Sequence, residues 1–105
     1  MNEIFLDTET TGLSFKDGHR IVEIACVETN DLIATGNVFH RLINPERNIP
    51  EEAFKIHGFS EKFLSTKEKF DKISDDFLKS KIIEFNKKFD LSMIYMEYWK
   101  EIIKF

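Results

Sequence analysis

Asp7 and Glu9 stand one residue apart in the segment FLDTETTGL, at the end of a short apolar run. Residues two apart in a strand project from the same face, so the two carboxylates are expected to point together. Their mutual repulsion is unfavourable unless a cation lies between them, and Mg²⁺ and Mn²⁺ prefer such oxygen ligands. The spacing therefore indicates a divalent-metal site, although an acidic strand end exposed to solvent has the same pattern.

A strand and the turn after it must position these carboxylates. The apolar run at residues 3–7 predicts that strand, and Gly12 in the turn would let the backbone approach a ligand closely. Residues 20–29 alternate between two largely apolar faces, which is typical of a strand buried on both sides. Residues 32–44 predict a third strand with an irregularity at Gly36. The short turns between the three indicate an antiparallel meander.

Helices are expected after the strands. Pro50 with two acids behind it is a favourable helix opening, and Gly58 is a favourable end. Apolar residues at helical spacing then predict a second, longer helix within residues 60–80. These residues are Phe70, Ile73, Phe77 and Leu78. The apolar residues from 81 to 105 fit a continuation of that helix, or a short strand followed by a helix from Phe89.

Composition and charge limit the classes of function. The 105 residues are enough for one domain, and no apolar run is as long as the roughly 20 residues that span a bilayer. A single cysteine, Cys26, and an N-terminus without a secretory pattern favour a cytoplasmic protein. The net charge of −4 is unfavourable for binding a phosphate backbone by bulk electrostatics. A nucleic-acid ligand would therefore need metal ions to be accepted by the acidic first half.

The segments FLDTETTGL, GHRIVEIACVE and TGNVFHRLINPERNIPEEAFKIHGFS resemble, in order and spacing, the DnaQ-like 3′–5′ exonucleases. The similarity is greatest to the epsilon proofreading subunits of bacterial DNA polymerase III, and it runs from about Ile4 to Leu78. It implies an α/β fold of the RNase H-like type, here three antiparallel strands followed by helices. Residues 1–105 would form one partial exonuclease domain, family-like over 1–80 and divergent over 81–105.

The resemblance also implies roles for individual residues. The family hydrolyses the 3′ end of DNA with two divalent ions, Mg²⁺ or Mn²⁺, and Asp7 and Glu9 match the first motif that binds them. His57 matches a histidine near the substrate. The residues that match the cradle of the terminal nucleotide are Thr8, Thr10, Thr11, Gly12 and Leu13. The polymerase alpha subunit is the protein partner that the resemblance implies.

The second motif of the family matches only in part. In IIEFNKKFD, Asn86, Phe89 and Asp90 agree with the family pattern, whereas Phe85 and Lys87 depart from it. Asp90 is accordingly a candidate third metal ligand and catalytic residue, or an exposed acid on a continuous helix. The third motif, which carries the family's histidine base and last aspartate, is not found, because no histidine follows His57.

Three functional interpretations follow from these matches. The first is a 3′–5′ exonuclease whose activity is weak or absent in this chain by itself. The second is a non-catalytic remnant or split fragment that binds a polymerase subunit or a missing C-terminal half. The third is an α+β domain with neither metal nor nucleic acid as a ligand. His19 and His40 do not match the missing base, and both are expected to have structural roles only.

Overall fold

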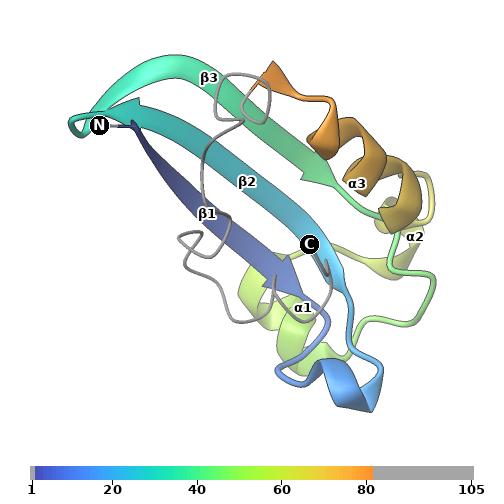
Figure 1. The fold of residues 1–105 in the computed structure, drawn as a ribbon. Helices are drawn as coiled ribbons and strands as arrows, with labels where there is room; N and C mark the ends of the chain where they lie inside the picture. The colour runs from blue at the N-terminus through green and yellow to red at the C-terminus, as the bar shows by residue number, and fades with distance from the viewer. Residues whose placement is uncertain (1, 82–105) are drawn as a thin grey trace.

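The computed structural model describes residues 2–81, in which three strands precede the helices (Figure 1). Strands β1 (Asn2–Thr10), β2 (Ile21–Asn30) and β3 (Ile33–Leu42) form one antiparallel sheet in the order β1-β2-β3. A short 3₁₀ helix, η1 (Phe15–Asp17), lies in the connection between β1 and β2. The predicted meander is confirmed.

Strand β1 is longer than the apolar run that predicted it. Its pairing with β2 continues past Asp7 to Thr10. Glu9 lies opposite Glu23, and the register shifts between Glu9 and Thr10. Ladder hydrogen bonds with β2, rather than side-chain hydrophobicity, extend the strand here. Both acidic residues therefore lie inside the strand and not at its frayed end.

The two faces of β2 are buried to different extents. Ile24 and Cys26 belong to the hydrophobic core, whereas Ala25 and Val27 on the other face are only half-buried. Within residues 2–81, β2 is thus fully buried on one face only, so the prediction of burial on both faces is met for that face. The less buried face is the one to which Asp7 and Glu9 project.

The predicted irregularity at Gly36 is confirmed. The pairing of β2 with β3 shifts register where Val27 faces Val38 and Thr29 faces Ala34. Gly36 lies in this bulge with φ = +91°, a left-handed conformation that glycine adopts without steric cost.

Helix α1 (Glu51–His57) is confirmed at both predicted ends. Pro50 precedes it, and Gly58 ends it in the left-handed conformation, with its N–H donating to the Phe54 carbonyl at 2.7 Å. The predicted longer helix is wrong in its first part, because it is divided into α2 (Glu61–Leu64) and α3 (Phe70–Leu78).

The break between α2 and α3 has a local cause. The hydroxyls of Ser65 and Thr66 donate back to the carbonyls of Lys62 and Phe63, at 2.6 and 2.9 Å. Such bonds compete with continued helical hydrogen bonding. Lys69 then forms an isolated parallel bridge with Asn44, and a residue in an extended conformation cannot also be helical.

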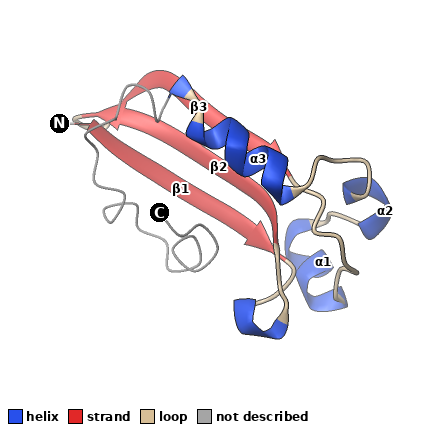
Figure 2. Ribbon diagram, turned by 45° about the vertical axis from the view of Figure 1, so that its right-hand side comes forward, coloured by secondary structure: helices blue, strands red, loops and turns tan. Residues whose placement is uncertain are grey.

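Helix α3 covers one face of the sheet, whereas α1 and α2 gather beyond the end at which β1 and β3 finish (Figures 1 and 2). Ile73 and Phe77 are the buried residues of α3, and the Phe77 ring meets the Phe39 ring edge-on with centroids 5.2 Å apart. Leu78 remains 49% exposed, so the apolar stripe of this helix is narrower than its sequence predicts.

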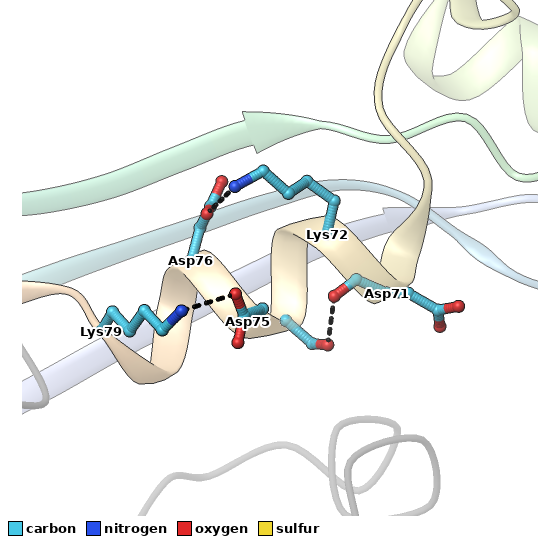
Figure 3. A network of polar contacts seen from close by, with 6 residues as sticks. Asp71, Lys72, Asp75, Asp76 and Lys79 are labelled. Atoms are coloured by element: carbon cyan, nitrogen blue, oxygen red, sulfur yellow. Dashed lines mark hydrogen bonds and ion pairs between the residues drawn. The ribbon is translucent and has the colours of Figure 1, made fainter.

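The outer face of α3 carries paired charges (Figure 3). Lys72 contacts Asp76 at 2.7 Å and Lys79 contacts Asp75 at 3.0 Å, each four residues apart. The bond to Asp76 raises the pKa of Lys72, and the same bond lowers the pKa of Asp76. This arrangement is typical of a solvated helix face, where such pairs contribute little to stability because water screens them.

No helix within residues 2–81 is long and apolar enough to cross a membrane. Asp90 and the alternative structures predicted for residues 81–105 fall outside the described residues, apart from Lys81 itself.

Candidate active site

Asp7 and Glu9 project from the same face of the sheet, as predicted. Across the ladder Asp7 lies opposite Ala25, and Glu9 lies opposite Glu23. Asp7 is exposed and Glu9 is half-buried. An oxygen of Asp7 accepts a hydrogen bond from the backbone N–H of Thr8 at 3.0 Å. The remaining oxygens of the pair stand on one surface, where a cation can reach them.

Two further polar residues lie on this face. Glu23, opposite Glu9, is bonded through its Oε2 to the Nε2 of His40 at 2.7 Å. Sequence reasoning gave His40 no role beyond the strand. Its proximity to the acidic pair follows from the register, since His40 lies opposite Ala25, which itself lies opposite Asp7.

The turn after β1 is held by its own threonines. The Thr10 hydroxyl donates to the Gly12 carbonyl at 2.7 Å. Thr11 is buried, and its backbone N–H donates to the Arg20 carbonyl at 2.9 Å, while the Arg20 N–H donates to the Thr11 hydroxyl at 2.9 Å. The backbone N–H of Thr11 is therefore engaged in fixing the turn and does not contact a ligand.

A cavity of about 480 Å³ lies between this turn and α1. One wall comes from residues 8–13 together with His19. The other wall comes from Pro50 and from residues of α1, among them His57. Glu9 and every residue predicted to contact the substrate thus meet around one cavity, and Asp7 stands two residues earlier on the same strand.

His57 presents an unused polar atom in this region. Its Nδ1 accepts a hydrogen bond from the backbone N–H of Phe59 at 3.0 Å, and its ring stacks on the Phe59 ring with centroids 5.2 Å apart. The bond to Nδ1 places the ring proton on Nε2. That Nε2 is buried and has no hydrogen-bond partner among the described residues. A buried N–H without an acceptor is unfavourable by about 1–3 kcal/mol, which an acceptor on a ligand would relieve.

The rim of the cavity is apolar. Leu13 is 98% exposed and Ile56 is 78% exposed, and both line the cavity. Two large apolar side chains held in water beside a hollow are suited to contact with a flat apolar surface such as a nucleobase.

The carboxylates fit a hard divalent cation in their chemistry. Mg²⁺ and Mn²⁺ are bound by oxygen, commonly through one or two carboxylates with the remaining positions filled by water and substrate phosphate. Asp7 and Glu9 supply two such carboxylates from one face of β1. Within residues 2–81, no group of three or more histidine, cysteine, aspartate or glutamate side chains is close enough to hold a metal ion.

Comparison with protein families matches residues 4–104 to the exonuclease family. Among curated proteins, the chain is 50% identical to DNA polymerase III subunit epsilon of Rickettsia conorii over 92% of its own length. It is 36% identical to the same subunit of Escherichia coli over 97% of its length. The chain spans 44% of the length of each of these relatives.

Two solved structures are similar to the described fold. Exonuclease X, solved in complex with 5′ overhanging duplex DNA, superposes with a TM-score of 0.60 at 31% identity, covering 70% of this chain and 42% of that one. Cell-death related nuclease 4 superposes with a TM-score of 0.67 at 20% identity, covering 81% of this chain and 31% of that one. These likenesses confirm the expected α/β fold of the RNase H-like type.

Proposed function

The chain belongs to the exonuclease family, and on that premise we propose that it removes nucleotides from the 3′ end of single-stranded DNA. One observation carries the proposal: Asp7 and Glu9 share a face of β1, beside a cavity to which residues 8–13 and His57 contribute. A strand that is acidic only by chance gives no reason to expect such a cavity next to it.

Asp7 and Glu9 are the residues that would hold Mg²⁺ or Mn²⁺. A divalent ion bound there would supply positive charge for a phosphodiester and increase the acidity of a water molecule. Asp90, which lies outside the described residues, stays in the proposal as a third ligand on the strength of its match to the second motif.

The turn and α1 would bind the terminal nucleotide. Thr10 and Thr11 fix the turn by the hydrogen bonds described above, so that Gly12 and Leu13 are held at the mouth of the cavity. Leu13 would lie against the base. The Nε2–H of His57 would donate to an acceptor on the nucleotide, which would give this buried group a hydrogen-bond partner.

We propose that hydrolysis by this chain alone is slow. The family's general base is a histidine of the third motif, and His57 is the last histidine of the sequence. Removing a general base commonly lowers a rate by about 10²–10⁴. A polymerase subunit is the expected protein partner, because the curated relatives are themselves subunits of DNA polymerase III.

A second candidate is a binding role without catalysis, in which the chain associates with a polymerase subunit or with a separate C-terminal half. The observation that favours it is the lack of a counterpart to the family's histidine base, since His57 is the last histidine of the sequence. The two candidates differ in whether a phosphodiester bond is cut.

The test is release of nucleotides from a 5′-labelled single-stranded oligonucleotide with Mn²⁺, using the full chain. We expect slow shortening from the 3′ end, lost in Asp7→Asn and in Glu9→Gln. Glu68→Gln is the matched control, since Glu68 is exposed and lies remote in sequence from the carboxylate pair. It should retain the wild-type rate.

The outcomes separate the candidates. Shortening that survives Asp7→Asn would contradict the proposed site. Absence of shortening in a chain that still binds Mn²⁺ and nucleotide through these residues would select the binding role.

A further inference from the structure

His19 lies flat against Gly12 in the wall of the cavity. A methyl group added at Gly12 would stand 2.5 Å from Nδ1 and from Nε2 of His19, and closer still to Cε1. Three nearly equal distances to these ring atoms place that point over the face of the imidazole rather than beyond its edge. The backbone of the turn and the imidazole ring are therefore in direct contact, and glycine is required for it.

The hydroxyl of Thr11 determines which ring nitrogen of His19 carries the proton. Thr11 Oγ1 accepts a hydrogen bond from the Arg20 N–H at 2.9 Å and lies 3.0 Å from His19 Nδ1. Thr11 is 1% exposed, so its own hydroxyl proton needs an acceptor inside the protein. Among the described residues the acceptor in reach is Nδ1. The hydroxyl thus donates to Nδ1, and the ring proton is on Nε2.

The Nε2–H of His19 has no acceptor among the described residues, although it belongs to a side chain that lines the cavity together with Glu9 and His57. Contact with Gly12 sets the plane of the His19 ring, and the hydrogen bond to Thr11 sets its tautomer. The Nε2–H donor is therefore held in one orientation. A group fixed in this way has lost its conformational freedom before a ligand arrives, which favours binding.

We propose that His19 is a substrate-contacting residue, whose Nε2–H donates a hydrogen bond to an oxygen of the nucleotide in the cavity. The inference rests on the proposed function and goes beyond it, because the family resemblance gave His19 a structural role only. Thr11 and Gly12 are then positioning residues that act through His19 as well as through the turn.

Two substitutions separate contact from structure. The oxygen of asparagine lies close to the position of Nδ1, so His19→Asn keeps an acceptor for Thr11 and removes the Nε2 donor. The amide nitrogen of glutamine reaches the position of Nε2, so His19→Gln retains a donor to the nucleotide. Affinity for deoxythymidine monophosphate in the presence of Mn²⁺, measured by calorimetry on the full chain, is the readout.

We expect His19→Asn to weaken nucleotide binding by about 3- to 10-fold, the usual effect of one neutral hydrogen bond. His19→Gln should stay within about twofold of the wild type. Mn²⁺ affinity without nucleotide should be the same in all three proteins. Equal nucleotide affinity in His19→Asn and the wild type would overturn the inference, and so would equal losses in both variants.

A measurement on the unaltered chain keeps the inference testable if either variant fails to fold. In the ¹⁵N spectrum of the histidine rings, addition of the nucleotide should move the Nε2 resonance of His19 and leave that of His40 in place. An unmoved His19 resonance in a protein that binds the nucleotide would contradict the role of His19 and leave the proposed function standing. Failure of the wild type to bind the nucleotide at all would overturn the proposed function as well.

Discussion

Glu9 and Glu23 are direct partners across β1 and β2, so two carboxylates face each other on the open side of the sheet. Like charges in this position destabilise a sheet by a few tenths of a kcal/mol to about 1 kcal/mol. His40 holds Glu23 at 2.7 Å, which relieves part of the repulsion, while Glu9 has no hydrogen-bond partner among the described residues. The strand therefore carries an acid that is unfavourable for folding and is suited to binding a cation.

Replacing that acid should stabilise the metal-free protein. We predict that Glu9→Gln raises the free energy of unfolding by about 0.5 kcal/mol in EDTA, because it removes the repulsion with Glu23. Urea titration followed by circular dichroism measures this. Glu68→Gln, at an exposed position, should change the value much less. A clear loss of stability in Glu9→Gln would show that Glu9 has a structural role instead.

The contact of α3 with the sheet should dominate stability. Phe77 is fully buried against Phe39, and Phe77→Ala is predicted to lower the free energy of unfolding by about 3–5 kcal/mol, a large part of the roughly 5–15 kcal/mol of an ordinary domain. Leu78→Ala is the matched control on the adjacent residue, which is 49% exposed, and it should cost much less. Similar losses in both variants would contradict the packing of α3 on this face.

Cys26 should be unreactive in the folded protein. Burial, assisted by the nearby Glu28 carboxylate, raises the pKa of the Cys26 thiol to about 12, so little thiolate exists at neutral pH. We predict slow reaction with a thiol-specific disulfide reagent at pH 8 and fast reaction once guanidinium unfolds the chain. Fast reaction under native conditions would mean that the strand pair around Cys26 opens readily.

Glu3 should make stability depend on pH at the other end of the sheet. The Leu32 backbone N–H and the Thr29 hydroxyl donate to its carboxylate at 2.8 and 2.9 Å, and they lower the pKa of Glu3. Because the pKa of Glu3 is lower in the folded state than in the unfolded chain, its carboxylate stabilises the fold at pH values above the unfolded-state pKa. This contribution is lost as the pH falls through the folded-state pKa.

The measurement for Glu3 is a series of thermal melts between pH 3 and 7. Glu3→Gln should melt below the wild type near neutral pH, and the two midpoints should converge as the pH falls below the ordinary glutamate pKa of about 4.3 and through the lower folded-state pKa. A difference in midpoint that is constant across the whole range would show that hydrogen bonding to the charged form of Glu3 is not its cause.

The strands could be predicted from sequence because their causes are local. Alternation in residues 20–29 and the glycine at position 36 mark β2 and the bulge in β3, and Pro50 and Gly58 bound α1. The division of α2 from α3 was missed, since the hydroxyl bonds of Ser65 and Thr66 act together with the Asn44–Lys69 bridge, which joins segments distant in sequence. Apolar periodicity contains no information about such a bridge.

The placement of the candidate site residues was predictable where residues that are neighbours in sequence form the site. Asp7, Glu9 and the turn after them follow from strand periodicity and one glycine. The contacts of His19 and His40 were not predicted, because their partners Thr11 and Glu23 lie 8 and 17 residues away in sequence and are brought close by strand pairing. Register, which fixes these contacts, is set by the whole sheet.

Binding of Mn²⁺ to the full chain tests the central claim most directly. The measurement is the loss of the electron paramagnetic resonance signal of free Mn²⁺ as the ion binds. Saturable binding is expected in the wild type and in Glu68→Gln. Asp7→Asn and Glu9→Gln should each weaken it at least tenfold, which corresponds to about 1.4 kcal/mol. Equal binding in all four proteins, or none in the wild type, would contradict a metal site at this carboxylate pair.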